Sequence, residues 1–237
     1  MHSTTEPRLL TLREVDLRLV DGVWPWAEAN RAAIEAHWAA LTAANPALFN
    51  GRVLVMRQRE IDGEVMTGQV IAVDYASFLA MRDFGAPDPG TGNCFAMAAL
   101  RSADGAYVLG VMGSHTANAG RVYFPAGTPD MSDVLPDGRL DLLGSVTREL
   151  AEETGITPDD VTIEEGWTAV FEGARVALMR IVRSPLSAAE LVGRIERFLA
   201  SEEQPELAGL KLVRRAADID TATMPLFLQH YLRHVLA

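Results

Sequence analysis

The segment from Asp141 to Ile156 constrains the fold most, because it is a helix whose charges are not confined to the solvent side. At about 100° per residue its apolar residues define one arc: Leu142, Leu143, Val146 and Leu150. Glu153 falls inside this arc, Glu149 lies at its edge, and Glu152 lies further round on the same side, away from solvent. Asp141 is placed to cap the helix and Gly155 to end it. We therefore expect a helix that packs on a core with glutamates beside its apolar face.

Three glutamates of this helix lie close together. Glu149 is three residues from Glu152 and four from Glu153, a spacing that places Cβ atoms about 5–6 Å apart. At that range each like-charged pair costs on the order of 3 kcal/mol at an effective dielectric near 20. A cation should offset this repulsion, and clustered carboxylate oxygens suit Mg²⁺ or Mn²⁺. The alternative is a solvated acidic helix face on which Arg148 relieves the charge.

Residues 1–90 are expected to form a small α+β N-terminal subdomain. The patterns in it are a strand at 15–20, a helix from Pro25 to Asn45, and a hairpin of strands at 52–60 and 64–73. The stretch 85–92 contains two prolines and three glycines, so it is the candidate linker to the rest of the chain.

Residues 91–237 are expected to form the second domain. The apolar runs CFAMAAL and AYVLGVM flank Asp104 and Gly105, which predicts a hairpin of buried strands where a core sheet begins. Further elements are expected in this order: the helix at 141–154, strands within 167–182 that break near Gly173, a helix at 187–200, a strand at 210–214 and a helix from Pro225 to the end.

Composition narrows the function classes. The formal net charge of −11 disfavours non-specific binding to nucleic acid or to an anionic membrane, whereas a small phosphorylated substrate stays compatible with it. Cys94 is the only cysteine, so the chain can form no internal disulfide. The N-terminus lacks a secretory pattern, and no window reaches the roughly 18 apolar residues of a membrane span. A cytoplasmic protein is expected.

The stretch RELAEETGI, residues 148–156, resembles the C-terminal half of the Nudix signature at every specified position. In that signature the order is Arg-Glu-U-x-Glu-Glu-x-Gly-U, with U aliphatic. The resemblance implies an α/β/α sandwich with a mixed β-sheet, and hydrolysis of a nucleoside diphosphate linked to another group. It also implies that Glu149, Glu152 and Glu153 bind Mg²⁺ or Mn²⁺, and that Arg148 orients a glutamate.

The upstream stretch FPAGTPD, residues 124–130, resembles the loop that carries the first glycine of the signature, and we call it the glycine loop. That role falls to Gly127, with a nearby backbone carbonyl oxygen available to metal. The family expects a glutamate six residues later, where Asp133 stands, and seven residues between it and the Arg-Glu pair. Here fourteen residues intervene, and counting backward from Arg148 reaches Leu140 instead. Asp133 is therefore a candidate metal ligand that replaces this glutamate.

Two other sets of residues are candidates for the site. The loop SEEQPEL offers Glu202, Glu203 and Glu206 as general base, and Glu206 is favoured because Pro205 stiffens the loop beside it. A helix glutamate is the alternative base, and a solvated acidic helix end is the alternative reading of the loop.

The polar stretch SHTANAGR places His115, Asn118 and Arg121 before the glycine loop, where they are candidates for binding phosphate or sugar hydroxyls. An ordinary turn is the alternative. Tyr75, Arg82 and Asp83 are candidates to reach the substrate from the N-terminal subdomain, and core packing is the alternative for this stretch.

The stretches LFNG and DYASFLAMRD, together with the interrupted signature, are similar to a Nudix branch that hydrolyses UDP-glucose. A nucleotide sugar is therefore the expected substrate, with ADP-ribose as the alternative. A second hypothesis is a Nudix-like domain that binds a nucleotide and regulates with little hydrolysis. Since Nudix proteins often dimerise, Trp24, Trp26 and Trp38 are candidates for a homodimer interface, which core packing explains equally well.

Overall fold

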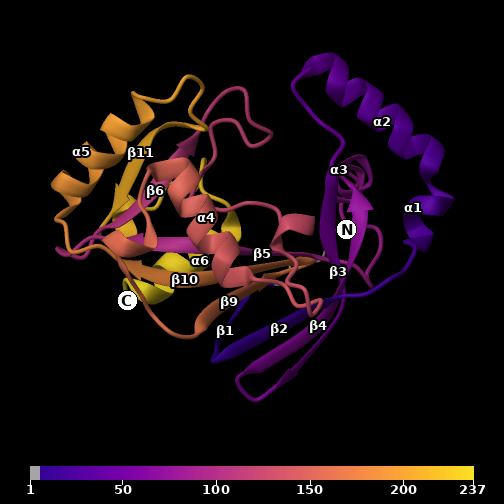
Figure 1. Cartoon of the computed structure of the whole chain (residues 1–237), viewed down its shortest axis with the longest axis horizontal. Coiled ribbons are helices and arrows are strands. Elements are labelled where there is room, and N and C mark those ends of the chain that lie inside the picture. The colour runs from indigo at the N-terminus through magenta and orange to yellow at the C-terminus, as the bar shows by residue number, and fades with distance from the viewer. Residues whose placement is uncertain (1–5) are drawn as a thin grey trace.

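A computed structural model describes residues 6–237 and shows two lobes, each built on its own sheet (Figure 1). Residues 1–5 lie outside the described part. They belong to the N-terminal segment in which no secretory signal is expected. The larger sheet has the order β1-β9-β10-β5-β6-β11, with β7 beside β6 and β8 beside β10. Its strands are β1 Arg8–Leu12, β5 Asn93–Arg101, β6 Tyr107–Met112, β7 Val122–Tyr123, β8 Thr162–Ile163, β9 Trp167–Glu172, β10 Arg175–Arg183 and β11 Leu207–Val213.

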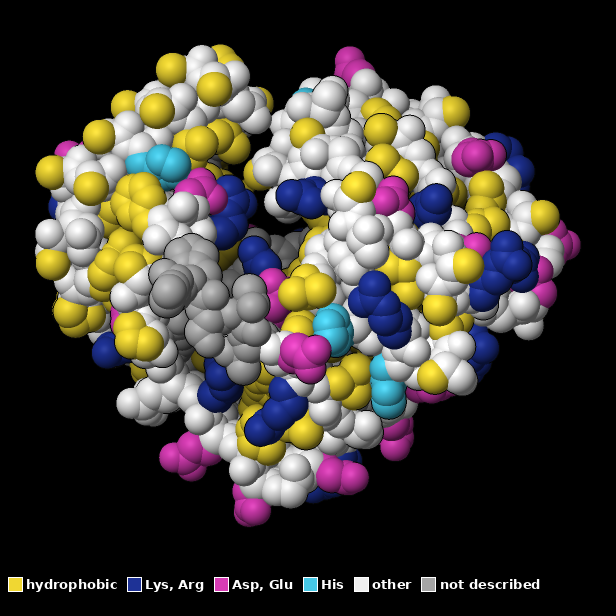
Figure 2. All heavy atoms as spheres, turned by 180° about the vertical axis from the view of Figure 1, so that it is seen from behind, with side chains coloured by type: hydrophobic (Ala, Val, Ile, Leu, Met, Phe, Trp, Pro, Cys, Tyr) yellow, Lys and Arg dark blue, Asp and Glu magenta, His cyan; other side chains and the backbone are white. Residues whose placement is uncertain are grey.

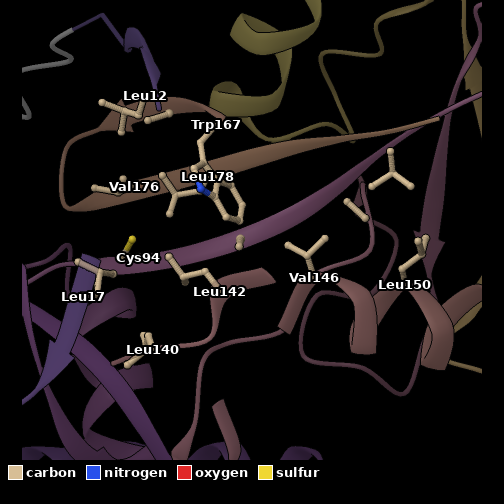
Figure 3. Packing of buried hydrophobic residues seen from close by; sticks show 14 of the residues in the cluster. Leu12, Leu17, Cys94, Leu140, Leu142, Val146, Leu150, Trp167, Val176 and Leu178 are labelled. Carbon is tan, nitrogen blue, oxygen red and sulfur yellow. The ribbon is translucent and has the colours of Figure 1, made fainter. Parts of the chain in front are cut away.

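Helices cover both faces of the larger sheet, because alternate residues of its buried strands point to opposite sides. On one face α4 (Leu142–Thr154) and α5 (Ala188–Leu199) pack in a cluster that contains Ala96, Ala98 and Leu178. Figure 3 shows Val146 and Leu150 of α4 turned toward these strands. On the other face α6 (Leu226–Val235) packs against a second cluster. Strands β5 and β10 are parallel and the other pairs of this sheet are antiparallel, so the expected mixed α/β/α arrangement is confirmed.

The predicted hairpin around Gly105 forms only in part. Strands β5 and β6 are neighbours in the sheet but pair at a single position, Arg101 with Tyr107. The long ladders of these two strands are with β10 and β11 instead. The two apolar runs are buried as expected, but their hydrogen-bonding partners lie elsewhere in the chain.

The smaller lobe has a three-stranded sheet of order β2-β4-β3, formed by β2 Glu14–Leu19, β3 Arg52–Asp62 and β4 Val65–Asp74. Three helices accompany it: α1 Pro25–Ala29, α2 Arg31–Ala44 and α3 Tyr75–Asp83. The helix expected from Pro25 to Asn45 is therefore interrupted at Asn30. Trp24 is buried in this lobe, with Trp26 and Trp38 partly buried against the same cluster.

Two elements of the first 90 residues were not predicted. Strand β1 joins the larger sheet by pairing with β9. The domain boundary expected at residue 90 stays a proposal, and β1 precedes that boundary although it packs in the larger lobe. Helix α3 begins where the Asp74 side chain accepts a hydrogen bond from the Ser77 amide, at 2.9 Å. This capping pattern was the available signal for the helix.

Helix α4 has the ends that its local signals predict. The Asp141 carboxylate accepts from the Gly144 amide at 2.8 Å, and Gly155 ends the helix in the left-handed region at φ 67°. Among residues 6–237, every helix is too short or too polar to cross a lipid bilayer.

The extra residues before α4 form a loop that docks on the smaller lobe. The Leu19 amide donates to the Gly138 carbonyl and the Leu140 amide to the Leu17 carbonyl, each at 2.8 Å. Upstream of this loop, the Leu54 amide of β3 donates to the Pro129 carbonyl at 2.8 Å. The segment between the glycine loop and α4 thus connects the two lobes.

Candidate functional site

Two of the three α4 glutamates are turned inward. Glu153 is 3% exposed and the Glu149 side chain 13% exposed, whereas the Glu152 side chain is 61% exposed. The position of Glu153 within the apolar arc is therefore confirmed. The expectation that Glu152 also lies on that side is wrong, because its side chain faces solvent. Since burial of an unpaired carboxylate is costly, the surroundings of Glu149 and Glu153 decide what this site can do.

Arg148 contacts three carboxylates. Its Nη1 lies 2.7 Å from Glu149 Oε1 and 3.3 Å from Glu152 Oε2, and its Nη2 lies 2.9 Å from Asp133 Oδ1. The second Asp133 oxygen accepts from the Asp130 amide at 3.0 Å. Asp133 is thus beside Arg148 in space although the loop at 134–140 separates them in sequence. Arg148 gives Glu149 and Glu152 the charge relief considered above, while no cation among residues 6–237 pairs with Glu153.

Asp133→Asn is expected to lower the melting temperature and to reduce activity by about tenfold. The substitution keeps an oxygen for one donor but removes the negative charge that holds the guanidinium, and a weakened buried ion pair costs on the order of 1–3 kcal/mol. Thermal unfolding, compared with an Asp137→Asn control in the exposed pair with Arg139, measures the effect. Equal melting temperatures for both variants would show that the Asp133 contact is dispensable.

The glycine loop lies directly against the two buried glutamates. The Ala126 amide donates to Glu153 Oε1 at 3.0 Å. A Cβ atom on Gly127 would lie 2.1 Å from Glu149 Oε1 and 2.5 Å from its Cδ. Only glycine therefore allows the Glu149 carboxylate to rest against this backbone.

Both buried glutamates hold their protons more tightly than usual. Burial raises the pKa of Glu149 to about 7, and the neighbouring charges of Glu152 and Glu206 add to this while Arg148 opposes it. Burial likewise raises the pKa of Glu153 to about 8, against the hydrogen bond from Ala126 and with repulsion from Glu149. Deprotonating both groups concentrates negative charge that a bound cation would stabilise.

Glu206 lies near this pair and is exposed. It directly precedes β11, which begins three residues earlier than predicted, and its backbone carbonyl accepts from the Gly113 amide at 2.7 Å. Its charge contributes to the raised pKa of Glu149 and of Glu153. Glu202 and Glu203 are exposed in the loop before it.

No three His, Cys, Asp or Glu side chains within residues 6–237 lie close enough together to hold a metal ion by themselves. Two inward carboxylates nevertheless fit Mg²⁺, since this ion is usually held by one or two carboxylates together with waters and substrate phosphates. Glu149 and Glu153 are such a pair, beside a loop whose backbone approaches closely.

A pocket of about 840 Å³ lies beside the glycine loop, between the two lobes. Figure 2, which views the molecule from behind, shows a hollow with Lys and Arg side chains on both of its sides. Its walls come from α3 (Tyr75, Phe78, Arg82, Asp83), the loop before β7 (Ala117, Asn118, Ala119, Arg121), the glycine loop (Ala126, Gly127, Thr128), the larger sheet (Asn93, Phe95, Met97, Tyr123, Arg175) and the region of α6 (Thr221, Met224, Pro225, Leu226, Phe227, Gln229).

The pocket brings together most of the substrate-binding candidates. Asn118, Arg121 and Gly127 line it, as do the three candidates on α3. His115 does not line it, and its backbone carbonyl instead accepts from Asn45 Nδ2 at 3.3 Å. None of the α4 glutamates lines the pocket either, although Ala126 and Gly127, which contact Glu153 and Glu149, do line it.

Several residues that line the pocket were not identified as candidates from the sequence. Phe95 and Phe227 form an edge-to-face pair with ring centroids 5.5 Å apart, and the Tyr123 hydroxyl accepts from Asn118 Nδ2 at 3.1 Å. These residues lie within apolar runs that read equally well as core, so the only local signal was the neighbouring polar stretch at 114–121.

No protein-family model matches the chain, and no curated protein matches it. Among solved structures, the chain is similar to RenU, a Nudix hydrolase from M. smegmatis, at 13% identity and a TM-score of 0.39, over 61% of this chain and 82% of RenU. It is also similar to the MutT protein from Methanosarcina mazei Go1 at 19% identity and a TM-score of 0.39, over 60% of this chain and 91% of that one. The function proposed for this chain therefore rests on its own residues.

Proposed function

We propose that the chain is a Nudix-type pyrophosphohydrolase that depends on a divalent metal and cleaves the diphosphate of a nucleoside diphosphate derivative. One observation carries the proposal. Glu149 and Glu153 of the RELAEETGI stretch are buried against the glycine loop, and the same loop lines a pocket with arginine and aromatic walls.

Glu149, Glu152 and Glu153 would hold Mg²⁺ or Mn²⁺, with a backbone carbonyl near Gly127. When bound, such ions supply Lewis-acid polarisation of the diphosphate and ease ionisation of a water molecule. Asp133 was the further candidate ligand. Since both of its carboxylate oxygens already accept hydrogen bonds from protein donors, we assign it to holding Arg148, which in turn orients Glu149.

The remaining candidates have roles at the substrate. Glu206 would act as general base, because it is exposed and close enough to raise the pKa of both buried glutamates. Asn118 and Arg121 would bind phosphate or sugar oxygens from the pocket wall. No substrate contact is proposed for His115, because it does not line the pocket and its backbone carbonyl accepts from Asn45.

Mg²⁺ affinity should rise between about pH 6 and pH 8.5. The pKa of Glu149 is raised to about 7 and that of Glu153 to about 8, so both are protonated and unable to bind metal at the lower pH. The metal-free protein should lose stability as pH rises from about 4.5, the ordinary pKa of these carboxyls, to about 8, since over that range the folded chain holds protons that the unfolded chain has released. Calorimetric Mg²⁺ titrations and melting curves at several pH values measure both effects, and a flat affinity would contradict the expectation.

A nucleotide sugar such as UDP-glucose is the proposed substrate, and ADP-ribose is the alternative. The pocket has room for a nucleoside and a second ring, and its aromatic walls suit ring stacking. Incubation with Mg²⁺ or Mn²⁺ and a panel of UDP- and ADP-linked sugars, followed by product analysis, tests the reaction and the substrate together. Absence of turnover on every member would overturn the proposal.

The second candidate is a nucleotide-binding regulator with little hydrolysis. The observation that favours it is Arg148, which already neutralises Glu149 and Glu152 without a metal ion. The same panel separates the candidates, because a regulator would bind a member tightly and release no product.

A further inference from the structure

The smaller lobe builds one wall of the pocket. Tyr75, Phe78, Arg82 and Asp83 of α3 line the cavity, and residues 117–121 line it from the other lobe. The rings of Tyr75 and Phe78 are stacked, with centroids 5.8 Å apart. A ligand that fills this cavity therefore contacts both lobes.

Arg82 is held in place by one edge only. Its Nε donates to Asp83 Oδ1 at 2.7 Å, and the second Asp83 oxygen lies 2.9 Å from His37 Nε2 on α2. The two Nη groups of Arg82 have no hydrogen-bond acceptor among residues 6–237. The side chain is only 31% exposed, so it presents a fixed guanidinium with unused donors at the pocket wall.

Arg121 contributes a second guanidinium from the larger lobe. Its one side-chain hydrogen bond within residues 6–237 is a 3.5 Å contact from Nη1 to the Ala222 carbonyl. No described acid pairs with it, so most of its donors are unused as well. Arg175 also lines the pocket, but it is ion-paired with Glu172 at 3.1 Å.

The charge of the pocket is opposite to that of the whole chain. Three arginines and one acid, Asp83, line it, whereas the chain has a formal net charge of −11. A guanidinium fork binds phosphate through paired hydrogen bonds, and a cleft lined by one sign of charge concentrates ligands of the other sign.

We propose that Arg82 and Arg121 form a two-lobe anion clamp that binds the phosphate groups of the ligand without needing a metal ion. The identification of the anion as the substrate's phosphates rests on the proposed function. The clamp makes the N-terminal subdomain part of the binding site, and the contacts of β2 and β3 with the segment before α4 hold that subdomain in position.

Calorimetric titration of the full chain with inorganic pyrophosphate in EDTA at low salt tests the clamp. The wild-type chain should bind, and Arg82→Ala and Arg121→Ala should each weaken binding by about tenfold or more. Arg82→Lys keeps the charge but loses the fork, so it should retain part of the affinity. Arg215→Ala, at an exposed arginine paired with Asp218 outside the pocket, is the matched control and should bind as wild type.

Three results would overturn the clamp: no metal-free binding by the wild type, wild-type affinity in Arg82→Ala or Arg121→Ala with an unchanged melting temperature, or an equal loss in Arg215→Ala. Hydrolysis is measured separately with Mg²⁺ and the nucleotide panel. Pyrophosphate binding without any turnover would leave the clamp standing and remove the proposed reaction. Turnover by a chain that shows no metal-free pyrophosphate binding would keep the reaction and remove the clamp.

Discussion

Glu153→Gln is expected to lower turnover by about a thousandfold, which corresponds to about 4 kcal/mol in the activation barrier. Glutamine keeps an oxygen that can accept from the Ala126 amide, so the 3.0 Å hydrogen bond and the packing of the helix are retained. What is lost is the negative charge proposed to hold the metal ion. A buried carboxyl with a raised pKa is costly to ionise, so its replacement should leave the melting temperature unchanged or higher.

Initial rates with Mg²⁺ on the substrate identified by the panel measure the loss of turnover, and thermal unfolding measures the melting temperature. Glu196→Gln on α5 is the matched control, because Glu196 is exposed and lies outside both the pocket and the glutamate group. A Glu153→Gln rate within a few-fold of wild type would show that this carboxylate is not required.

Gly127→Ala is expected to reduce turnover by about a hundredfold or more without unfolding the protein. The new Cβ would overlap the Glu149 carboxylate, which is the far end of a flexible side chain and can move aside. The fold is therefore spared, while Glu149 leaves the position in which Arg148 holds it. Since catalytic groups misplaced by about 1 Å cost on the order of a hundredfold, the effect should be confined to activity and metal affinity.

Gly193→Ala in the interior of α5 is the control for this substitution. An added Cβ there meets nothing nearer than Arg197 Nη1 at 3.6 Å, and alanine favours a helix by about 0.5–1 kcal/mol over glycine. That variant should be as active as wild type and slightly more stable. Comparable activity in both glycine variants would remove the proposed role of the close approach at Gly127.

Local signals predicted the helices and turns best. The ends of α4 followed from Asp141 and Gly155, and the turn between β9 and β10 from Gly173, because capping and left-handed backbone are decided within a few residues. The burial of Glu153 also followed from the helical period. Helix α3 was missed, although Asp74 carried its capping signal.

Strand partners were not predictable in the same way. The run at 94–100 was expected to pair with the strand that follows it, and it does lie beside that strand, but its long ladder is with β10, some 80 residues later. Strand β1 pairs with β9, which follows it in the sequence only after most of the chain. Apolar strands pair equally well with several partners, so the choice depends on how all helices and strands pack at once.

By itself the sequence determined that three glutamates and an arginine lie within two turns of a helix with an apolar face, since helical geometry sets the relations among residues 148–153. Only the tertiary structure decided that Asp133 reaches Arg148 across the loop at 134–140, and that Arg82 and Arg121 line one pocket. The first contact depends on how the loop at 134–140 folds, and the second depends on the packing of the two lobes; neither is encoded by a local pattern.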